Sequence, residues 1–179
     1  MIVIPTFRGF LGGSKIPALS LSVSLVKPGF EMGIGSGGYT YQPAGNGWNM
    51  GSSCGVTGQN SPWISGNPPE GSNCAYIQQG GTTANQMSQS ISTTPGTKYR
   101  VYCSGSCRPA PYNPMNFDIQ LDGVKIGEFT GSVPGTFYLV SASFTATATS
   151  HTFGFQGQNP AGGDKAVLID DVKIFYPDT

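Results

Sequence analysis

Charged residues are scarce in this sequence, and their scarcity limits the classes of partner that it can bind. Nine Lys and Arg residues balance nine Asp and Glu residues among 179, so the formal net charge is zero. A protein that binds nucleic acid needs a basic surface to displace counterions from phosphate groups, and no cluster of Lys and Arg occurs here. We therefore expect no nucleic-acid partner.

Long apolar runs are missing as well. No run approaches the ~20 residues that a membrane-spanning helix requires, so we expect no membrane insertion. The stretch 16–26 is interrupted by serines, and no small-residue cleavage site follows it. Because the chain also begins at Met1, we expect no secretion through a signal peptide.

Residues that commonly perform catalysis are few. His151 is the single histidine, and its place in a Thr/Phe alternation is typical of packing or of a hydrogen bond at a strand end. The sequence has no nucleophile elbow, phosphate-binding loop or zinc-protease motif. Glu31, Glu70 and Glu128 could in principle supply a glycosidase pair, but Glu31 and Glu128 have ordinary structural explanations. We expect a binding protein rather than an enzyme.

Glycine and proline, by contrast, are abundant, with 27 Gly and 14 Pro spread along the chain. Helical patterns are nearly absent, whereas turn-forming residues repeatedly separate short apolar runs, which favours many short strands. Alternation is clearest at 117–121, where Phe, Ile and Leu share one face. Asp122-Gly123 then predicts a two-residue hairpin turn. The sequence therefore predicts an all-β sandwich.

The chain divides into an N-terminal arm, residues 1–24, and a β-sandwich domain, residues 25–179. The arm cannot bury much apolar surface against itself, so it must dock, either as an edge strand on its own sandwich or on another protein subunit of an assembly. The segment from Cys54 to Ser72 is rich in Gly, Asn and Pro and has the length of many binding loops. We expect strands at 25–31, 39–42, 46–50, 73–79, 86–92, 97–104, 115–121, 124–130, 136–145, 150–157 and 165–176.

Four cysteines allow three disulfide pairings. In a straight strand Cys103 and Cys107 would lie about 13 Å apart, too far for a disulfide without a bulge or turn at Gly105. Their spacing, with Cys54 and Cys74 distant in sequence, is a weak zinc pattern. Disulfides, free buried thiols and a metal site are all open at this point.

Several motifs, in order along most of the chain, resemble those of the carbohydrate-binding-module jelly rolls of the galactose-binding-like superfamily. Each motif alone is weak, whereas together they are specific for the fold. They are Pro28-Gly29-Phe30-Glu31, Gly47-Trp48, Pro69-Glu70-Gly71-Ser72, Ala75-Tyr76-Ile77-Gln78, Gln89-Ser90-Ile91, Pro95-Gly96-Thr97-Lys98-Tyr99, Asp122-Gly123, Ser143-Phe144-Thr145-Ala146, His151-Thr152-Phe153 and Leu168-Ile169-Asp170-Asp171-Val172-Lys173-Ile174.

This resemblance implies a jelly-roll β-sandwich of two antiparallel sheets that binds a glycan or polysaccharide without catalysis. It also implies a structural Ca2+ ion, held by Glu31 and Asp170 with Asp171 as a further candidate and main-chain carbonyls completing the ligands. Alternation in the last strand turns Asp170 toward the core, where a carboxylate is costly unless it is paired or bound to a cation. Alternatively, backbone N–H groups or a buried water satisfy Asp170.

Sugars bind by stacking their C–H faces on aromatic rings while amides and charged groups fix their hydroxyls. Trp63, in the polar loop, is the leading aromatic candidate, whereas Trp48 is expected in the core. The other candidates are Tyr39, Tyr41, Tyr76 and Tyr112, most of which could instead cap the core, and the polar residues Gln78, Arg108, Asn113, Gln156 and Asn159.

The arm, the missing secretion signal and the lack of an attached catalytic domain depart from the resemblance. They lead us to expect a virion-surface component, such as a phage capsid decoration or a tail or adhesion protein. Residues 1–24 would dock it, and the module would face outward. The alternatives are a purely structural assembly protein without glycan binding, and an extracellular or cell-surface carbohydrate-binding module.

Overall fold

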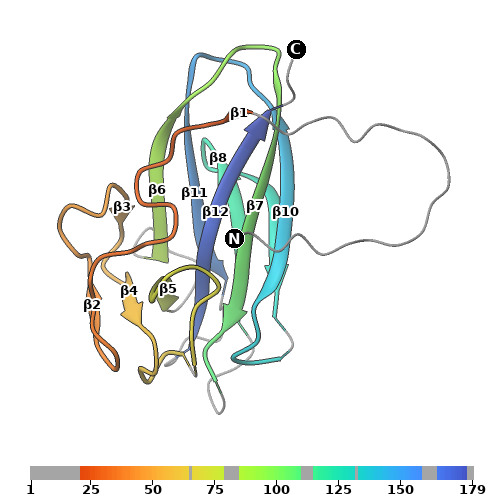
Figure 1. The fold of residues 1–179 in the computed structure, drawn as a ribbon. Coiled ribbons are helices and arrows are strands. Elements are labelled where there is room, and N and C mark those ends of the chain that lie inside the picture. The colour runs from red at the N-terminus through yellow and green to blue at the C-terminus, as the bar shows by residue number, and fades with distance from the viewer. Residues whose placement is uncertain are drawn as a thin grey trace, which may run out of the picture.

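The computed structural model describes residues 21–64, 66–78, 85–109, 115–131, 133–158 and 165–176. These residues form twelve strands in two antiparallel sheets that pack face to face (Figure 1). The predicted all-β sandwich is therefore confirmed. No helix among the described residues has the length and apolar character needed to cross a bilayer.

The larger sheet has seven strands. Six of them pair in the order β10-β7-β12-β5-β4-β2, and the seventh, β1, pairs with β12. In Figure 1, β12, β7 and β10 lie side by side in front of the second sheet. The strands of the larger sheet are β1 (Leu21–Ser22), β2 (Tyr39–Tyr41), β4 (Cys54–Gly58), β5 (Asn73–Gln78), β7 (Lys98–Cys107), β10 (Tyr138–Thr145) and β12 (Ala166–Tyr176).

The smaller sheet has five strands in the order β3-β6-β11-β8-β9. Its strands are β3 (Asn49–Met50), β6 (Gln86–Ser92), β8 (Asn116–Leu121), β9 (Val124–Thr130) and β11 (Ser150–Gln158).

One apolar core fills the space between the two sheets. Alternate residues of the longer strands point into it, including Phe117 on β8 and Phe153 and Phe155 on β11, all fully buried. Each such side chain contributes roughly 1.5–3 kcal/mol when it leaves water. Trp48 packs in the same core, 5.9 Å from Phe155 between ring centroids, as predicted.

The Asp122-Gly123 turn between β8 and β9 also forms as predicted. Both residues have positive φ angles, 51° for Asp122 and 77° for Gly123. Such angles at both central positions suit a type I′ hairpin, which Asp-Gly pairs favour.

The predicted strand at 25–31 is wrong, because a turn replaces it. The N–H of Phe30 donates to the carbonyl of Lys27 at 3.1 Å, and the φ angles of these residues are 55° and 44°. Pro28 and Gly29 form the middle of this turn, where proline fixes its own φ and glycine tolerates the bend. The apolar pattern of the segment reflects the burial of Phe30 rather than a strand.

The segment Cys54–Gly58, predicted as the start of a loop, is instead a strand, β4. All five of its residues are buried, because it lies between β2 and β5. Gly55 is required there, since a Cβ atom at this position would overlap the Thr40 carbonyl and the Tyr76 ring. The two glycines of β4 therefore allow close packing and do not mark a loop.

Of the predicted arm, only the last residues are described. Leu21 and Ser22 pair with the end of β12, and the N–H of Val23 donates to the carbonyl of Ile174 at 2.9 Å. Residues 1–20 lie outside the described part of the chain. Docking of the arm on another subunit stays a prediction.

The four cysteines are free and buried in the structure, without a disulfide between any two of them. β7 runs unbroken through Gly105, so Cys103 and Cys107 point into the core on the same face without meeting. Burial raises the pKa of Cys54 to about 12 and also raises that of Cys103, so both thiols stay protonated at neutral pH.

Candidate functional site

A β-bulge in β12 decides where the acidic side chains of the last strand point. The pairing of β12 with β7 shifts between Asp170 and Lys173, and Asp171 has a positive φ of 50°. Before the bulge Leu168 packs on the outer side of the sheet, whereas after it Val172 packs in the main core. The expectation that Asp170 points toward the core between the sheets is therefore wrong. Asp170 is buried, but on the outer side of the sheet.

Asp170 is a buried carboxylate with only one satisfied oxygen. Its Oδ2 accepts the N–H of Glu70 at 2.8 Å, while its buried Oδ1 has no partner. Loss of hydration raises the pKa of Asp170 to about 8, and the nearby carboxylates of Glu70 and Asp171 raise it as well. Asp170 is thus largely protonated at neutral pH unless a positive charge reaches it.

Glu31 and Glu70 lie in the same neighbourhood. The Oε1 atom of Glu31 accepts the N–H groups of Ser72 and Asn73 at 2.9 and 2.8 Å. Partial burial raises the pKa of Glu70, and repulsion from Glu31 adds to the effect. The chain thus brings Glu31, Glu70 and Asp170 together around residues 70–73.

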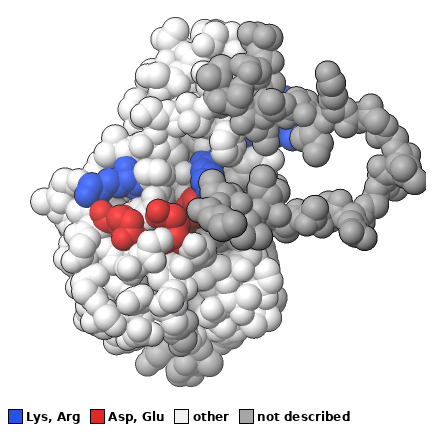
Figure 2. Space-filling model, in the orientation of Figure 1, with Lys and Arg blue, Asp and Glu red and all other residues white. Residues whose placement is uncertain are grey.

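Asp171, the third predicted metal ligand, points elsewhere. Its Oδ1 lies 2.7 Å from the Nζ atom of Lys173, and its side chain is 31% exposed. Figure 2 shows a face of the molecule where charged groups are few and the blue and red ones adjoin one another. An exposed ion pair of this kind contributes little to stability and leaves Asp171 engaged with Lys173.

The residues around Asp170 have some, but not all, of the features of a cation-binding site. No three described His, Cys, Asp or Glu side chains are arranged as a ready-made metal site. The unpartnered Oδ1 of Asp170, buried close enough to other carboxylates for them to raise its pKa, nonetheless suits a positive ion. Carboxylate oxygens are the ligands that Ca2+ prefers. Glu31 and Asp170 are the residues that would hold it.

Four rings form what we call the aromatic cluster: Tyr39, Tyr41, Trp63 and Tyr76. Trp63 stacks on Tyr76, with centroids 4.4 Å apart and planes inclined by 9°. Tyr39 and Tyr41, two residues apart on β2 and so on one face, meet Trp63 edge-on at 5.5 and 6.4 Å. The guanidinium carbon of Arg108 lies 4.3 Å from the Trp63 ring centroid, a cation–π contact.

The expectation that Trp63 is exposed in its polar loop is wrong, because Trp63 is only 4% exposed. The backbone N–H of Trp63 donates to the Oγ of Ser61 at 3.1 Å. The ring packs with Tyr76 and Leu168 in a second, smaller apolar core on the outer side. Trp63 and the fully buried Tyr76 therefore anchor the aromatic cluster and do not present open rings.

The exposed part of the cluster is its tyrosine pair. Tyr39 and Tyr41 are 50% and 41% exposed. The Tyr41 hydroxyl donates to the Oε1 of Gln78 at 2.5 Å, which places an amide beside the rings. The structure thus brings together Tyr39, Tyr41, Trp63, Tyr76, Gln78 and Arg108, whereas Tyr112, Asn113 and Asn159 lie outside the described residues.

Gln156 does not join this cluster, because it lies on the outer face of the smaller sheet. It belongs to what we call the amide row, Gln86, Gln120 and Gln156, on three neighbouring strands. Gln86 Nε2 donates to Gln120 Oε1 at 2.9 Å, and Gln120 Nε2 donates to Gln156 Oε1 at 2.6 Å. Sequence reasoning missed Gln86 and Gln120, although both are polar positions next to core residues in alternating strands.

His151 has a structural role, as its sequence context predicts. Its Nδ1 lies 2.5 Å from the Oδ2 of Asp122, and its Nε2 accepts the N–H groups of Thr147 and Ala148, both at 3.2 Å. Because both ring nitrogens are engaged, His151 joins the turn before β9 to the turn before β11.

No family model matches the sequence, and no curated protein matches it. Among solved structures, the fold is similar to TmCBM61 in complex with beta-1,4-galactotriose, at 16% identity and a TM-score of 0.56. That match covers 85% of this chain and 97% of the other. The CBM22-1 xylan-binding domain of Paenibacillus barcinonensis Xyn10C is 11% identical, with a TM-score of 0.55, and 80% and 97% of the two chains are covered.

A third similar structure is larger. It holds the CBM22-1 and GH10 modules of Clostridium thermocellum xylanase 10B with xylohexaose, at 14% identity and a TM-score of 0.51. The match covers 74% of this chain but only 26% of that one. At these identities the likeness shows the fold alone. That fold is a jelly-roll β-sandwich of the kind found in these carbohydrate-binding modules, as the resemblance of the sequence motifs implies.

Proposed function

We propose that this chain is a non-catalytic glycan-binding module and that its tyrosine pair, Tyr39 and Tyr41, contacts the sugar. The proposal proceeds from the carbohydrate-binding-module fold. One observation carries it: two half-exposed rings are held in place by buried Trp63 and Tyr76, with the Gln78 amide beside them.

This arrangement suits a sugar for two physical reasons. A pyranose presents apolar C–H faces to aromatic rings and hydroxyls to neighbouring amides. Rings that are already fixed lose little conformational entropy on binding, because Tyr39 and Tyr41 pack edge-on against Trp63 in the free protein. The similar structures contain a galactotriose and a xylohexaose, so β-1,4-linked galactan and xylan oligosaccharides are the first ligands to test.

The test is a glycan array followed by calorimetric titration with the best oligosaccharide. We expect Tyr39→Ala and Tyr41→Ala each to weaken binding roughly tenfold or more, which is about 1.4 kcal/mol. Tyr102→Ala is the matched control, because this partly buried tyrosine lies on β7 outside the aromatic cluster. Unchanged affinity in both tyrosine variants, with the fold intact, would show that the tyrosine pair is not the binding surface.

The amide row is a second candidate surface, because its linked side chains lie on the open face of the smaller sheet. Gln156→Ala distinguishes the two surfaces in the same titration. If the aromatic cluster binds the sugar, Gln156→Ala keeps the full affinity. A loss confined to Gln156→Ala would move the site to the amide row.

We also propose that Glu31 and Asp170 hold a structural Ca2+ ion with the help of main-chain carbonyls. When bound, the ion supplies the positive charge that the buried Asp170 carboxylate lacks. Calcium should therefore raise the melting temperature of the wild-type protein and leave that of Asp170→Asn unchanged. Equal shifts in the two proteins would remove Asp170 from the ligand set.

Finally, we propose that residues 1–24 dock the module on other subunits at a virion surface. The support is the apolar start of the arm and its inability to bury that surface against itself. Removal of residues 1–20 should abolish assembly, measured by sedimentation, while the circular dichroism spectrum stays the same. An unfolded remainder would instead make the arm a strand of its own sandwich.

A further inference from the structure

Among the described residues, the strand paths of the two sheets end in four strands, and one of these four differs from the rest. β2 has three residues and β3 has two, too few to pair well with another chain. β9 carries Lys125 and Glu128, and its pairing with β8 shifts register. Short length, charge and irregular register all discourage edge-to-edge association. β10 has eight residues, none of them charged, and pairs among the described strands only with β7.

The free backbone groups of β10 can be identified from its end. Ala146 donates its N–H to Thr97 at 2.9 Å and accepts that of Gly96 at 2.8 Å, so its polar backbone groups face β7. In an antiparallel ladder these groups alternate from one side of a strand to the other. The N–H and C=O groups of Leu139, Ser141 and Ser143 therefore point away from β7, to the side of β10 with which no described strand pairs.

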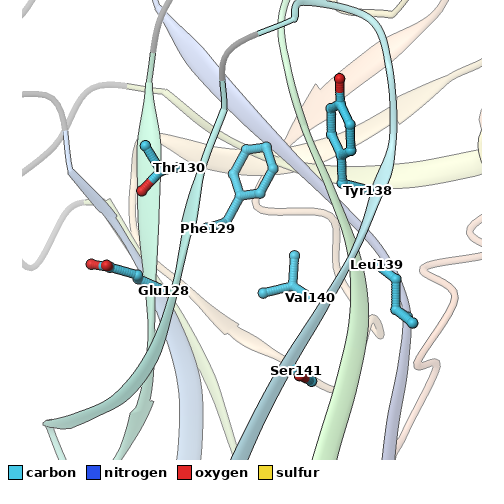
Figure 3. A pocket seen from close by; sticks show the side chains of 7 residues that line it. All are labelled: Glu128, Phe129, Thr130, Tyr138, Leu139, Val140 and Ser141. Carbon is cyan, nitrogen blue, oxygen red and sulfur yellow. The ribbon is translucent and has the colours of Figure 1, made fainter.

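Apolar surface adjoins this edge. Leu139 is 76% exposed and Tyr138 is 41% exposed, on a strand that offers no charge to keep other chains away. A groove of about 340 Å³ runs between β9 and β10, and Figure 3 shows Phe129 and Tyr138 facing it from the two strands. The other lining residues are Glu128, Thr130, Leu139, Val140 and Ser141.

We propose that β10 pairs antiparallel with β10 of a second copy of this chain, around a two-fold axis at Ser141. This register places Leu139 opposite Ser143 and Tyr138 opposite Phe144. Each side chain then stays on its own face, which a one-residue slip would prevent. β10 itself carries no charge, so the two paired strands place no like charges opposite each other. The larger sheet would then continue through both copies.

The test uses the full-length chain with Ser141→Cys under mild oxidation. Residues that exchange both hydrogen bonds across an antiparallel pair lie about 5.5 Å apart at Cα, within disulfide range. We expect Ser141→Cys to form a covalent dimer, seen by non-reducing electrophoresis. Ser143→Cys is the matched control, because it lies on the same strand and face but opposite Leu139. Equal cross-linking of both variants would overturn the register.

Sedimentation of the unmodified chain tests the dimer itself. We expect the mass of two chains, and that of one chain for Ser141→Lys, which places two like charges at the axis. A wild-type monomer at the highest soluble concentration would overturn the proposal. If the backbone amides of Leu139, Ser141 and Ser143 are then protected from hydrogen exchange, residues 1–20 of the same chain cover the edge instead. Neither outcome depends on whether the protein binds sugar.

Discussion

Strand residues alternate between the inner and outer faces in both sheets, but the two outer faces differ in whether another segment covers them. On the larger sheet the outward residues Cys74, Tyr76 and Leu168 are apolar and completely buried, because the segment that carries Trp63 folds over them. On the smaller sheet the outward residues include Gln120 and Gln156, and hydrogen bonds link their side chains. Strands that are apolar on both faces therefore mark a covered sheet, and strictly alternating strands mark an open one.

The same contrast governs the acidic residues. Asp170 lies under the cover with an unpartnered oxygen and a pKa raised to about 8. Asp118, on the open face, has its Oδ1 2.9 Å from the Nζ atom of Lys125. A carboxylate beneath the segment that carries Trp63 lacks both water and a counter-charge, whereas a carboxylate on the open face of the smaller sheet has access to both.

The largest effect should follow removal of the Trp63 ring, which packs the segment around it onto the outer face of the larger sheet. Trp63→Ala deletes the ring that stacks on Tyr76, and we expect a loss of about 3–5 kcal/mol in the free energy of unfolding. Urea denaturation measures this loss, and Gln156→Ala on the open face is the control. If Trp63→Ala costs no more than the control, the segment over the larger sheet is not a second core.

A second effect should come from the titration of Asp170. Its folded pKa of about 8 lies above the ordinary value of 3.8, so between these pH values the folded state binds more protons than the unfolded state. Without calcium, stability should therefore fall as pH rises from about 4 to about 8, because the buried carboxylate must ionise. Calcium should suppress this fall, since it stabilises the ionised form.

Melting temperatures measured across this pH range with chelator or with calcium test the prediction. Asp170→Asn should remove both the fall and the calcium effect, whereas Asp118→Asn on the open face should keep both. A flat pH profile for the wild-type protein in chelator would contradict the raised pKa of Asp170.

The smallest effect is expected on the open face. Gln120→Ala removes both hydrogen bonds of the amide row, but Gln86 and Gln156 are partly exposed and can turn to water. We expect a cost of about 0.5–1.5 kcal/mol by urea denaturation. A cost as large as that of Trp63→Ala would mean that the amide row is not an open surface.

Much of the fold could be predicted, because most strands carry local signals. The alternation of apolar residues located β8 and β11, and Asp122-Gly123 located the hairpin turn between β8 and β9. β4 was missed because its glycines are needed for close packing, a requirement that depends on β2 and β5. The bulge in β12 was missed for a similar reason, since it appears only in the pairing with β7.

The sequence predicted that some of the candidate side chains lie together, but it did not predict which of them are exposed. Tyr39, Tyr41 and Gln78 do meet, as aromatic and amide candidates for one surface should. Trp63 was expected to be the open ring but is buried, because solvent exposure depends on what the loop covers and not on its own polarity. The sequence next to Trp63 carries no sign of the apolar sheet face that lies beneath it.

The sequence alone determined the sandwich, its main turns, the neutral surface and the pool of aromatic and amide residues, because each rests on local pattern or composition. The tertiary structure decided which face of the larger sheet is covered, where Asp170 points and which tyrosines stay open to solvent. It also left β10 as the long, uncharged edge among the described strands. These outcomes depend on contacts between segments distant in the chain, and no local pattern encodes which distant segment will supply the cover.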